Sequence, residues 1–393
     1  MSKNALNVVI GQAARGEKYL PRTNITNEIW RKLEGGSSLL LVAPRRVGKS
    51  SILFHLFDNP KEKLLIAYYI SESVNNENEF YKKLFHHILG EMTTLRRYAA
   101  IVKTLAKKFP SCIESVGPEG IKFHPGNSVD YCDELRKLMQ KAVLNDDKII
   151  VLIDEFASTV ENIVQDEGER AAIHFLETKR SIRQDPVMQN KLQFIYAGSI
   201  GLENIVSKMN HVNLVADLAP IAVPPLTKKE VKKLINMIFD GSGITLEEDA
   251  FEHLLEITEW WIPYYFQIIL DESYKIIEER GSTVITKGDI DAAVKNALKQ
   301  RIYFEHWFAR LRKAYKANEF SFVKELLNVI SEKKRIPSSE IFNCAVKYGL
   351  ENSYTDLVNA LKHDGYINNS DNPKEYRFNS SLLREWWCAN VAN

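Results

Sequence analysis

The sequence is poor in cysteine and lacks any long apolar run. Its four cysteines are scattered along 393 residues, with no CxxC pair. This pattern excludes a disulfide framework and a cysteine-based metal site, and it is typical of reduced thiols in a cytosolic protein. The first residues lack an apolar signal core, and no run reaches the ~20 apolar residues that a membrane span needs. We therefore expect a cytoplasmic protein with no membrane partner.

The chain also lacks a net charge of either sign. Lysine and arginine number 52 and aspartate and glutamate 51, which gives a formal net charge of +1. The whole molecule therefore has no field that would draw it onto nucleic acid or an anionic membrane. The hydrophobic fraction of 45% and the charged fraction of 26% are those of an ordinary globular protein, and the length predicts two or three domains.

The most informative stretch is an apolar run that breaks into a turn ending in Gly-Lys-Ser. Residues 39–42 form the run, residues 43–48 form the turn, and a helical pattern begins at Lys49. A strand, this turn and a helix together are the context of a phosphate-binding loop. Backbone N–H groups of such a turn converge on one point, where the helix dipole also favours an anion. The alternative is a solvated basic turn before an ordinary helix.

Two side chains of this loop have expected chemical roles. Lys49 would reach the β- and γ-phosphates, and the Ser50 hydroxyl would ligate Mg²⁺. Ala43 stands where the pattern begins with a glycine, which is a mild departure. We expect the chain to bind ATP and Mg²⁺. The predicted nucleotide-binding residues of the loop are Ala43, Pro44, Arg45, Arg46, Val47, Gly48, Lys49, Ser50 and Ser51.

A second apolar run, 148–153, ends in two acidic residues, Asp154 and Glu155. This order places both carboxylates at the carboxyl edge of a sheet, where ligands of open α/β sheets bind. Asp154 would hold Mg²⁺ directly or through water, and Glu155 would polarise the attacking water. Adjacent acids at a strand end can also be plain surface residues, but the upstream phosphate loop favours a hydrolytic pair.

A third run, 192–197, is followed by Gly198-Ser199. A small polar residue after a central strand is expected of a γ-phosphate sensor, and Ser199 is the candidate. An ordinary Gly-Ser turn is the alternative interpretation.

The apolar runs alternate with helical patterns, which predicts a doubly wound parallel sheet. Residues 64–70 supply a further strand and 221–223 a weaker one, whereas 108–128, with three prolines and three glycines, is expected to be a surface loop. After Pro224 the pattern becomes helical, and Thr227 with Glu230 predicts a capping box.

The last part of the chain predicts a winged helix-turn-helix. Three short helical patterns follow Glu319, and two strands then flank an Asn/Ser/Asp/Pro-rich turn between residues 365 and 378. The predicted domains are a P-loop α/β ATPase core (1–224), an all-helical lid (225–300), and a linker helix with a winged-helix domain (301–393).

The order of motifs resembles that of the prokaryotic AAA-like (archaeal-type) P-loop ATPases, which are related to the AAA+ and STAND (signal-transducing, numerous-domain) ATPases. The motifs that carry the resemblance are Pro44-Arg45-Arg46, Asp154-Glu155-Phe156, Gly198-Ser199, Pro263 and the closing stretch 376–387. The resemblance implies a slow Mg²⁺-dependent ATPase that acts as a nucleotide-controlled molecular switch. It also implies ATP between the core and the lid.

The resemblance extends to further residues. The segment with Tyr19, Pro21 and Arg22 is similar to the one that borders the adenine in such ATPases, although Arg22 is equally interpretable as a surface arginine. Pro263 belongs to the lid element, but Trp261 stands where the family usually has glycine.

The sequence assigns no arginine finger. The stretch 207–214 after the sensor contains no arginine, unlike that of many relatives. Arg180 and Arg183 are alternatives, but a helix surface that forms salt bridges to Glu177 explains them equally well.

Charge does not favour DNA binding by the predicted winged helix. From Glu319 onward there are nine basic and ten acidic residues, whereas a dedicated duplex binder usually shows a basic surface. The preceding stretch 299–316 is basic and contains interleaved aromatic residues, which is typical of either a nucleic-acid surface or a helix core. The leading hypothesis is an ATP-dependent switch with ATP and ADP as ligands and a protein partner or self-assembly. A DNA-associated ATPase, similar to replication initiators or transposition regulators, is the alternative.

Overall fold

The computed structural model describes residues 6–94, 107, 109–117, 120–124, 129–141, 148–189, 191–198, 201–315 and 317–392. The chain forms two compact units. We call residues 21–43 with 49–223 the α/β unit. Residues 1–20, 44–48 and 224–393 make up the second unit, which we call the helical unit.

The α/β unit is built on a five-stranded parallel sheet with the order β2-β5-β6-β1-β7. Its strands are β1 (Leu39–Val42), β2 (Leu64–Ile70), β5 (Lys148–Asp154), β6 (Leu192–Tyr196) and β7 (Ala219–Ala222). The central strands are buried on both faces, as expected of near-continuous apolar runs in a parallel sheet. The predicted parallel-sheet fold class is confirmed.

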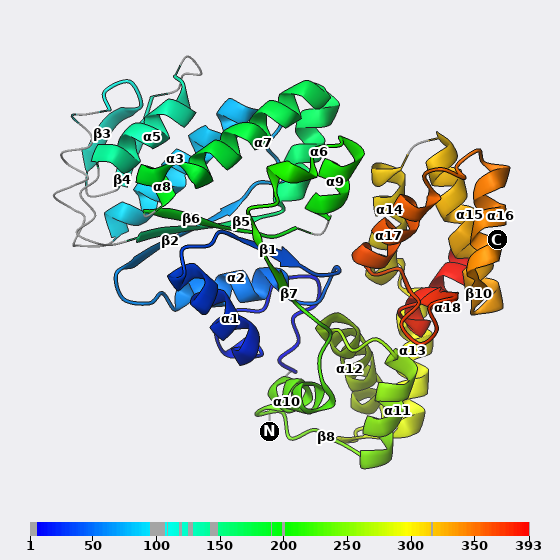
Figure 1. The fold of residues 1–393 in the computed structure, drawn as a ribbon. Helices are drawn as coiled ribbons and strands as arrows, with labels where there is room; N and C mark the ends of the chain where they lie inside the picture. The colour runs from blue at the N-terminus through cyan, green and yellow to red at the C-terminus, as the bar shows by residue number, and fades with distance from the viewer. Residues whose placement is uncertain are drawn as a thin grey trace. The chain divides into compact units, whose positions relative to one another are not determined.

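Helices cover both faces of this sheet (Figure 1). Helices α1 (Thr23–Glu34) and α2 (Lys49–Asp58) lie on one face, and α3 (Glu77–Thr94), α5 (Tyr131–Lys141) and α7 (Glu169–Gln184) lie on the other. Because all five strands run in parallel, the loops after their carboxyl ends meet at one edge. The remaining helical segments of this unit are α6 (Phe156–Asp166), α8 (Pro186–Gln189), α9 (Leu202–Lys208) and the 3₁₀ turn η3 (Val212–Leu214).

The prediction of a surface loop over 108–128 is wrong in its described part. Strands β3 (Ile113–Gly117) and β4 (Gly120–Phe123) pair in an antiparallel hairpin. Phe109 and Cys112, which precede the hairpin, are fully buried. Gly117 and Gly120, which suggested a loop, are paired with each other at the adjoining ends of the two strands. Gly120 has a φ of +111°, a conformation that a side chain would disfavour.

The helical unit begins with an N-terminal segment, including the 3₁₀ turn η1 (Gly16–Lys18), and continues after Pro224 with five helices. The Asn7 amide donates to the Ile238 carbonyl at 2.9 Å, which attaches the N-terminal segment to the first of them. The helices are α10 (Lys228–Phe239), α11 (Glu248–Thr258), α12 (Pro263–Glu279), α13 (Lys287–Lys299) and α14 (Arg301–Ala314), with a short parallel pair β8 (Thr245–Leu246) and β9 (Val284–Ile285).

The predicted capping box at the start of α10 is confirmed. The Glu230 amide donates to Thr227 Oγ1 at 3.3 Å, and the Thr227 amide donates to Glu230 Oε2 at 2.8 Å. A second box, which the sequence analysis missed, joins Thr286 and Asp289 at the start of α13.

The end of the chain contains helices and three short strands, and its interpretation as a winged helix-turn-helix stays a prediction. Its strands form an antiparallel sheet with the order β10-β12-β11. The elements are α15 (Ala317–Lys333), β10 (Ile336–Pro337), α16 (Ser338–Lys347), α17 (Tyr354–Asp364), β11 (Ile367–Asn368), β12 (Glu375–Phe378) and α18 (Ser381–Asn390). The domain boundaries proposed at 224 and 300 remain predictions.

One aromatic core joins these elements to the preceding helices. The ring centroids of Phe304 and Trp386 lie 5.8 Å apart, and those of Trp307 and Tyr366 lie 5.1 Å apart. Most aromatic residues of 299–316 are therefore core, which confirms that interpretation of the stretch. Arg310 is buried with them, and its Nε lies 3.3 Å from Asp364 Oδ2 in α17. This arginine is consequently unavailable to a nucleic acid.

Within the part of the chain that the structure describes, no helix combines the length and apolar character needed to cross a membrane.

Candidate functional site

The loop between β1 and α2 has the backbone conformation of an anion-binding turn. Arg46 and Gly48 have φ angles of +65° and +103°, which is unusual for two residues so close together and, at Arg46, for a non-glycine residue. Backbones that alternate in this way turn successive N–H groups toward one side and form a concave anion site. A Cβ placed on Gly48 would meet no heavy atom within 4 Å, so the loop has open space at this residue. Both observations fit a phosphate group.

Lys49, the first residue of α2, is held at the end of strand β1. Its ammonium donates to the Ala43 carbonyl at 2.7 Å, and the residue is 7% exposed. The contact keeps a positive charge at the carboxyl edge of the sheet. This is the position in which the sequence analysis expects a phosphate-binding lysine.

Asp154 ends strand β5 and is 5% exposed. Its Oδ1 accepts from the Glu155 amide at 3.0 Å, and its Oδ2 accepts from the Tyr68 hydroxyl at 3.2 Å. Burial raises the pKa of the Asp154 carboxyl, while hydrogen bonds from the Ser50 and Tyr68 hydroxyls oppose that rise. The structure thus brings together Ser50 and Asp154, the two predicted Mg²⁺ ligands.

A serine hydroxyl beside one buried carboxylate fits Mg²⁺. This ion keeps several waters and is usually held by one or two carboxylates together with substrate phosphates. Ser50 and Asp154 would be its protein ligands.

Glu155 has a strained backbone at the start of α6. Its φ is +56°, a left-handed value that costs a non-glycine residue about 1–3 kcal/mol. Ser158 Oγ donates to Glu155 Oε2 at 3.4 Å, and the Phe156 amide donates to the Ala197 carbonyl at 3.0 Å. These bonds fix the residue at the edge of the sheet. Backbone strain of this kind is found at active sites. It could not be predicted from the sequence.

The other predicted residues of the α/β unit are placed as follows. Ser51 is half-buried in α2, and Pro21 is exposed. Arg22, directly before α1, is 6% exposed, so the interpretation as a surface arginine is wrong. Ser199 lies outside the described residues, and its sensor role stays a prediction.

In the helical unit, the side chains of the loop contact three distant segments. The Arg46 guanidinium lies 4.7 Å from the centroid of the Tyr264 ring in α12 and donates to the Gly11 carbonyl at 3.1 Å. Arg45 Nη1 lies 3.5 Å from the His306 carbonyl in α14. These contacts attach the loop to the N-terminal segment and to α12 and α14.

Pro44 makes a further close approach. A Cβ placed on Gly365, which follows α17, would lie 2.8 Å from Pro44 Cβ and 2.6 Å from Trp260 Cη2. Only a residue without a Cβ fits there. The sequence offered one hint of these contacts, because Tyr264 directly follows the predicted site residue Pro263, which is the first residue of α12. Val47 and Tyr19 are buried in the same unit.

Arg183 is a structural residue of the α/β unit. Its Nε and Nη2 donate to the two carboxylate oxygens of Asp217 at 2.7 and 2.8 Å, and Nη2 also donates to the Leu214 carbonyl at 2.9 Å. The residue is buried, so the proposed surface pairing with Glu177 is wrong for Arg183. Both guanidinium edges are engaged, which removes it as a candidate arginine finger.

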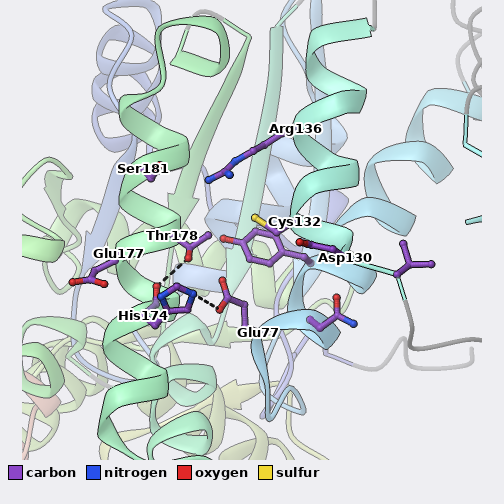
Figure 2. Close-up of a pocket in the computed structure, with 11 residues that line it drawn as sticks. Glu77, Asp130, Cys132, Arg136, His174, Glu177, Thr178 and Ser181 are labelled. Atoms are coloured by element: carbon purple, nitrogen blue, oxygen red, sulfur yellow. Dashed lines mark hydrogen bonds and ion pairs between the residues drawn. The ribbon is translucent and has the colours of Figure 1, made fainter. Parts of the chain in front are cut away.

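A separate polar cavity of about 720 Å³ is lined by residues of α3, α5 and α7 and their flanks (Figure 2). His174 Nε2 lies 3.7 Å from Glu77 Oε2, and the Thr178 hydroxyl donates to the His174 carbonyl at 3.0 Å. Carboxylates of Glu77, Asp130 and Glu177 share the lining with Arg136 and His174, and none of the predicted nucleotide-binding residues lines it.

No protein-family model matches the chain, and no curated protein matches its sequence. Among solved structures, a Walker-type ATPase of Pyrococcus abyssi matches with a TM-score of 0.64 and 18% identity, over 97% of this chain and 99% of the other. The Aeropyrum pernix ORC2 protein, solved as ADPNP–ADP complexes, matches with a TM-score of 0.56 and 10% identity, over 100% of this chain and 96% of the other. The chain therefore shares the overall fold of these two proteins.

Proposed function

We propose that this chain is a Mg²⁺-dependent ATPase that acts as a nucleotide-controlled molecular switch. The observation that carries the ATPase part is the meeting of Ser50 with Asp154 at the carboxyl edge of the sheet, beside Glu155 and Lys49. These are the residue types that a P-loop ATPase uses to hold phosphates and metal and to orient water. The solved structures of similar fold include a Walker-type ATPase and a protein in complex with ADPNP and ADP, which supports a nucleotide ligand.

Each residue would contribute one step to binding or hydrolysis. The loop N–H groups and the Lys49 ammonium would bind the β- and γ-phosphates, and Ser50 and Asp154 would hold Mg²⁺. The metal, when bound, supplies charge neutralisation between the β- and γ-phosphates. Glu155 would accept a hydrogen bond from the attacking water and aim it at the γ-phosphate. Tyr19, Pro21 and Arg22 remain the proposed neighbours of the adenine, and Ser199 the proposed sensor.

The switch part is supported by the contacts of Pro44, Arg45 and Arg46. These residues contact Gly365, His306 and Tyr264 of the helical unit, whereas Lys49 and Asp154 belong to the α/β unit. A loop that shifts when phosphates bind would therefore alter contacts of α12, α14 and the end of α17. Hydrolysis would be slow, because the described residues of the stretch after the sensor supply no arginine to the γ-phosphate.

The test of the ATPase proposal is binding of a fluorescent ATP analogue to the purified chain, with and without Mg²⁺, followed by measurement of phosphate release. We expect micromolar or tighter binding that strengthens with Mg²⁺, and slow release of phosphate. Absence of saturable binding would overturn the proposal.

A DNA-associated ATPase is the second candidate, and the helix and strand order of residues 317–378 favours it. Against it, Arg377 in β12 lies 3.2 Å from Glu259 and 3.0 Å from Asp371, so its charge is compensated within the chain. A duplex-binding assay over a salt series decides between the candidates, because phosphate contacts would give a steep salt dependence. Self-assembly or a protein partner is tested by turnover per protomer as a function of protein concentration.

A further inference from the structure

Tyr68 connects the strand that carries Asp154 to the helix that carries Ser50. In the sheet Tyr68 lies opposite Leu152, and Asp154, two residues further along β5, projects from the same face as Leu152. This register brings the Tyr68 hydroxyl to within 3.2 Å of Asp154 Oδ2.

The ring of the same tyrosine packs against α2. Its centroid lies 4.5 Å from that of Phe54 and 6.2 Å from that of Phe57. Phe54 is four residues after Ser50, so the two side chains lie on one side of the helix. One side chain therefore contacts both the carboxylate and the helix of the two proposed metal ligands.

We infer that Tyr68 is a positioning residue for Mg²⁺, one that fixes the Asp154 carboxylate and orients α2 relative to it. This inference rests on the proposed function. With Oδ1 occupied by the Glu155 amide and Oδ2 by the Tyr68 hydroxyl, the carboxylate is held in one orientation before any ligand arrives. Hydrogen bonds that orient a metal ligand typically contribute 10- to 100-fold to metal affinity.

The neighbouring residue provides a matched control. Tyr69 points to the opposite face of β2 and is almost completely buried, and its hydroxyl has no hydrogen-bond partner among the described residues. Removal of this hydroxyl changes the same number of atoms in the same strand but touches neither Ser50 nor Asp154.

The experiment measures the Mg²⁺ concentration that half-saturates the binding of a fluorescent, non-hydrolysable ATP analogue. Tyr68→Phe is expected to raise this concentration about 10-fold or more. Binding of the analogue in EDTA is expected to stay at the wild-type value, and Tyr69→Phe is expected to match the wild type in both binding measurements. The melting temperature without ligand checks that both variants remain folded. Phe54→Leu, which keeps the hydroxyl bond but loosens the ring packing, is expected to give a smaller rise.

An unchanged Mg²⁺ requirement in Tyr68→Phe would overturn the inference, and so would an equal rise in Tyr69→Phe. A wild-type chain that binds the analogue neither with nor without Mg²⁺ would instead overturn the proposed function itself. The two failures are therefore distinguishable in one set of titrations.

Discussion

The two parts of the phosphate-binding motif are held by different means. Lys49, Ser50 and Asp154 are fixed by hydrogen bonds within the α/β unit, to the end of strand β1 and around one carboxylate. Pro44 packs closely against Gly365, and Arg46 makes a cation–π contact with Tyr264, both within the helical unit. The first part, with Lys49, Ser50 and Asp154, carries the groups proposed to bind phosphate and metal. The second part, with Pro44 and Arg46, contacts helices that are distant in the sequence.

Because of this difference, substitutions in the two parts should have different effects. Changes in the first part should abolish binding or hydrolysis and leave the helical unit intact. Changes in the second part should weaken binding gradually and disturb the helical unit at the same time.

Lys49→Ala should have the largest effect. Removing a buried cation from a phosphate contact costs about 2–5 kcal/mol, which corresponds to about 30- to several-thousand-fold in ATP affinity. Equilibrium titration with a fluorescent ATP analogue measures this loss. The exposed Lys229→Ala in α10 serves as the control, and equal affinities of the two variants would contradict the role of Lys49.

Glu155→Gln should separate binding from hydrolysis. The amide keeps the size of the side chain but cannot accept a proton, and loss of such a group typically lowers a rate by about 10²- to 10⁴-fold. We expect ATP to bind with nearly wild-type affinity and phosphate release to fall below a hundredth of the wild-type rate. Turnover at the wild-type rate would remove Glu155 from its proposed role.

Gly365→Ala should damage the second part. The new Cβ would collide with Pro44 and Trp260 in a backbone with φ of +90°, and overpacking with left-handed strain costs about 2–4 kcal/mol. Both the free energy of unfolding and ATP affinity should fall.

Gly349→Ala is the matched control for this prediction. Gly349 follows α16 with φ of +69°, and an added Cβ would meet no heavy atom within 4 Å. It should therefore lose only the strain energy, about 1 kcal/mol, and keep its ATP affinity. If the two alanine variants proved equal, the contact between Gly365 and Pro44 would have no effect on the loop.

Tyr264→Ala should weaken ATP binding more modestly. A cation–π contact contributes about 0.5–2 kcal/mol, so loss of the ring under Arg46 should lower affinity about 2- to 30-fold. Tyr264→Phe keeps the ring and should bind ATP like the wild type. A loss of affinity in Tyr264→Phe as large as that in Tyr264→Ala would show that the ring face is not what holds Arg46.

The last prediction concerns a pH dependence of stability from His306, which needs no change in ATP affinity. Burial, together with the nearby charges of Arg46 and Arg45, lowers the pKa of His306 to about 3, below its ordinary value of 6.5. Between about pH 3 and pH 6.5, His306 is therefore protonated in the unfolded chain but neutral in the folded chain. Because protonation favours the unfolded chain, the free energy of unfolding falls as the pH drops below 6.5. Compared with His306→Gln, the wild type should lose about 1–2 kcal/mol of unfolding free energy between pH 7 and pH 5. Chemical denaturation at both pH values measures these free energies. An equal loss in the wild type and in His306→Gln would contradict this burial effect.

Much of the first part could be predicted from the sequence, because its signals are local. The apolar runs 39–42 and 148–153 are strands, and each is followed by the polar residues of the candidate site. A helix begins at Lys49, as its sequence pattern predicts. Their meeting follows from the parallel sheet, in which carboxyl ends share an edge.

The second part could not be predicted, because it depends on residues distant in the sequence. Nothing near Pro44 indicates that Gly365 will pack against it, and nothing in the residue type at position 155 indicates the positive φ of Glu155. Tyr68 illustrates the same limit within the sheet, since its contact with Asp154 depends on the register between β2 and β5. The strands 113–117 and 120–123 were not predicted, because both are short and the prolines and glycines of this stretch are typical of loops.

Hydrogen exchange of the full-length Glu155→Gln chain, with and without Mg²⁺-ATP, tests the central claim most directly. Peptides that cover the loop and the Asp154–Glu155 segment should gain protection on ATP binding. If the helical unit responds to the state of the loop, peptides over 260–266 and 301–310 should change protection as well. A response confined to the loop and to Asp154 and Glu155 would contradict the proposed switch, while leaving an ATP-binding site in place.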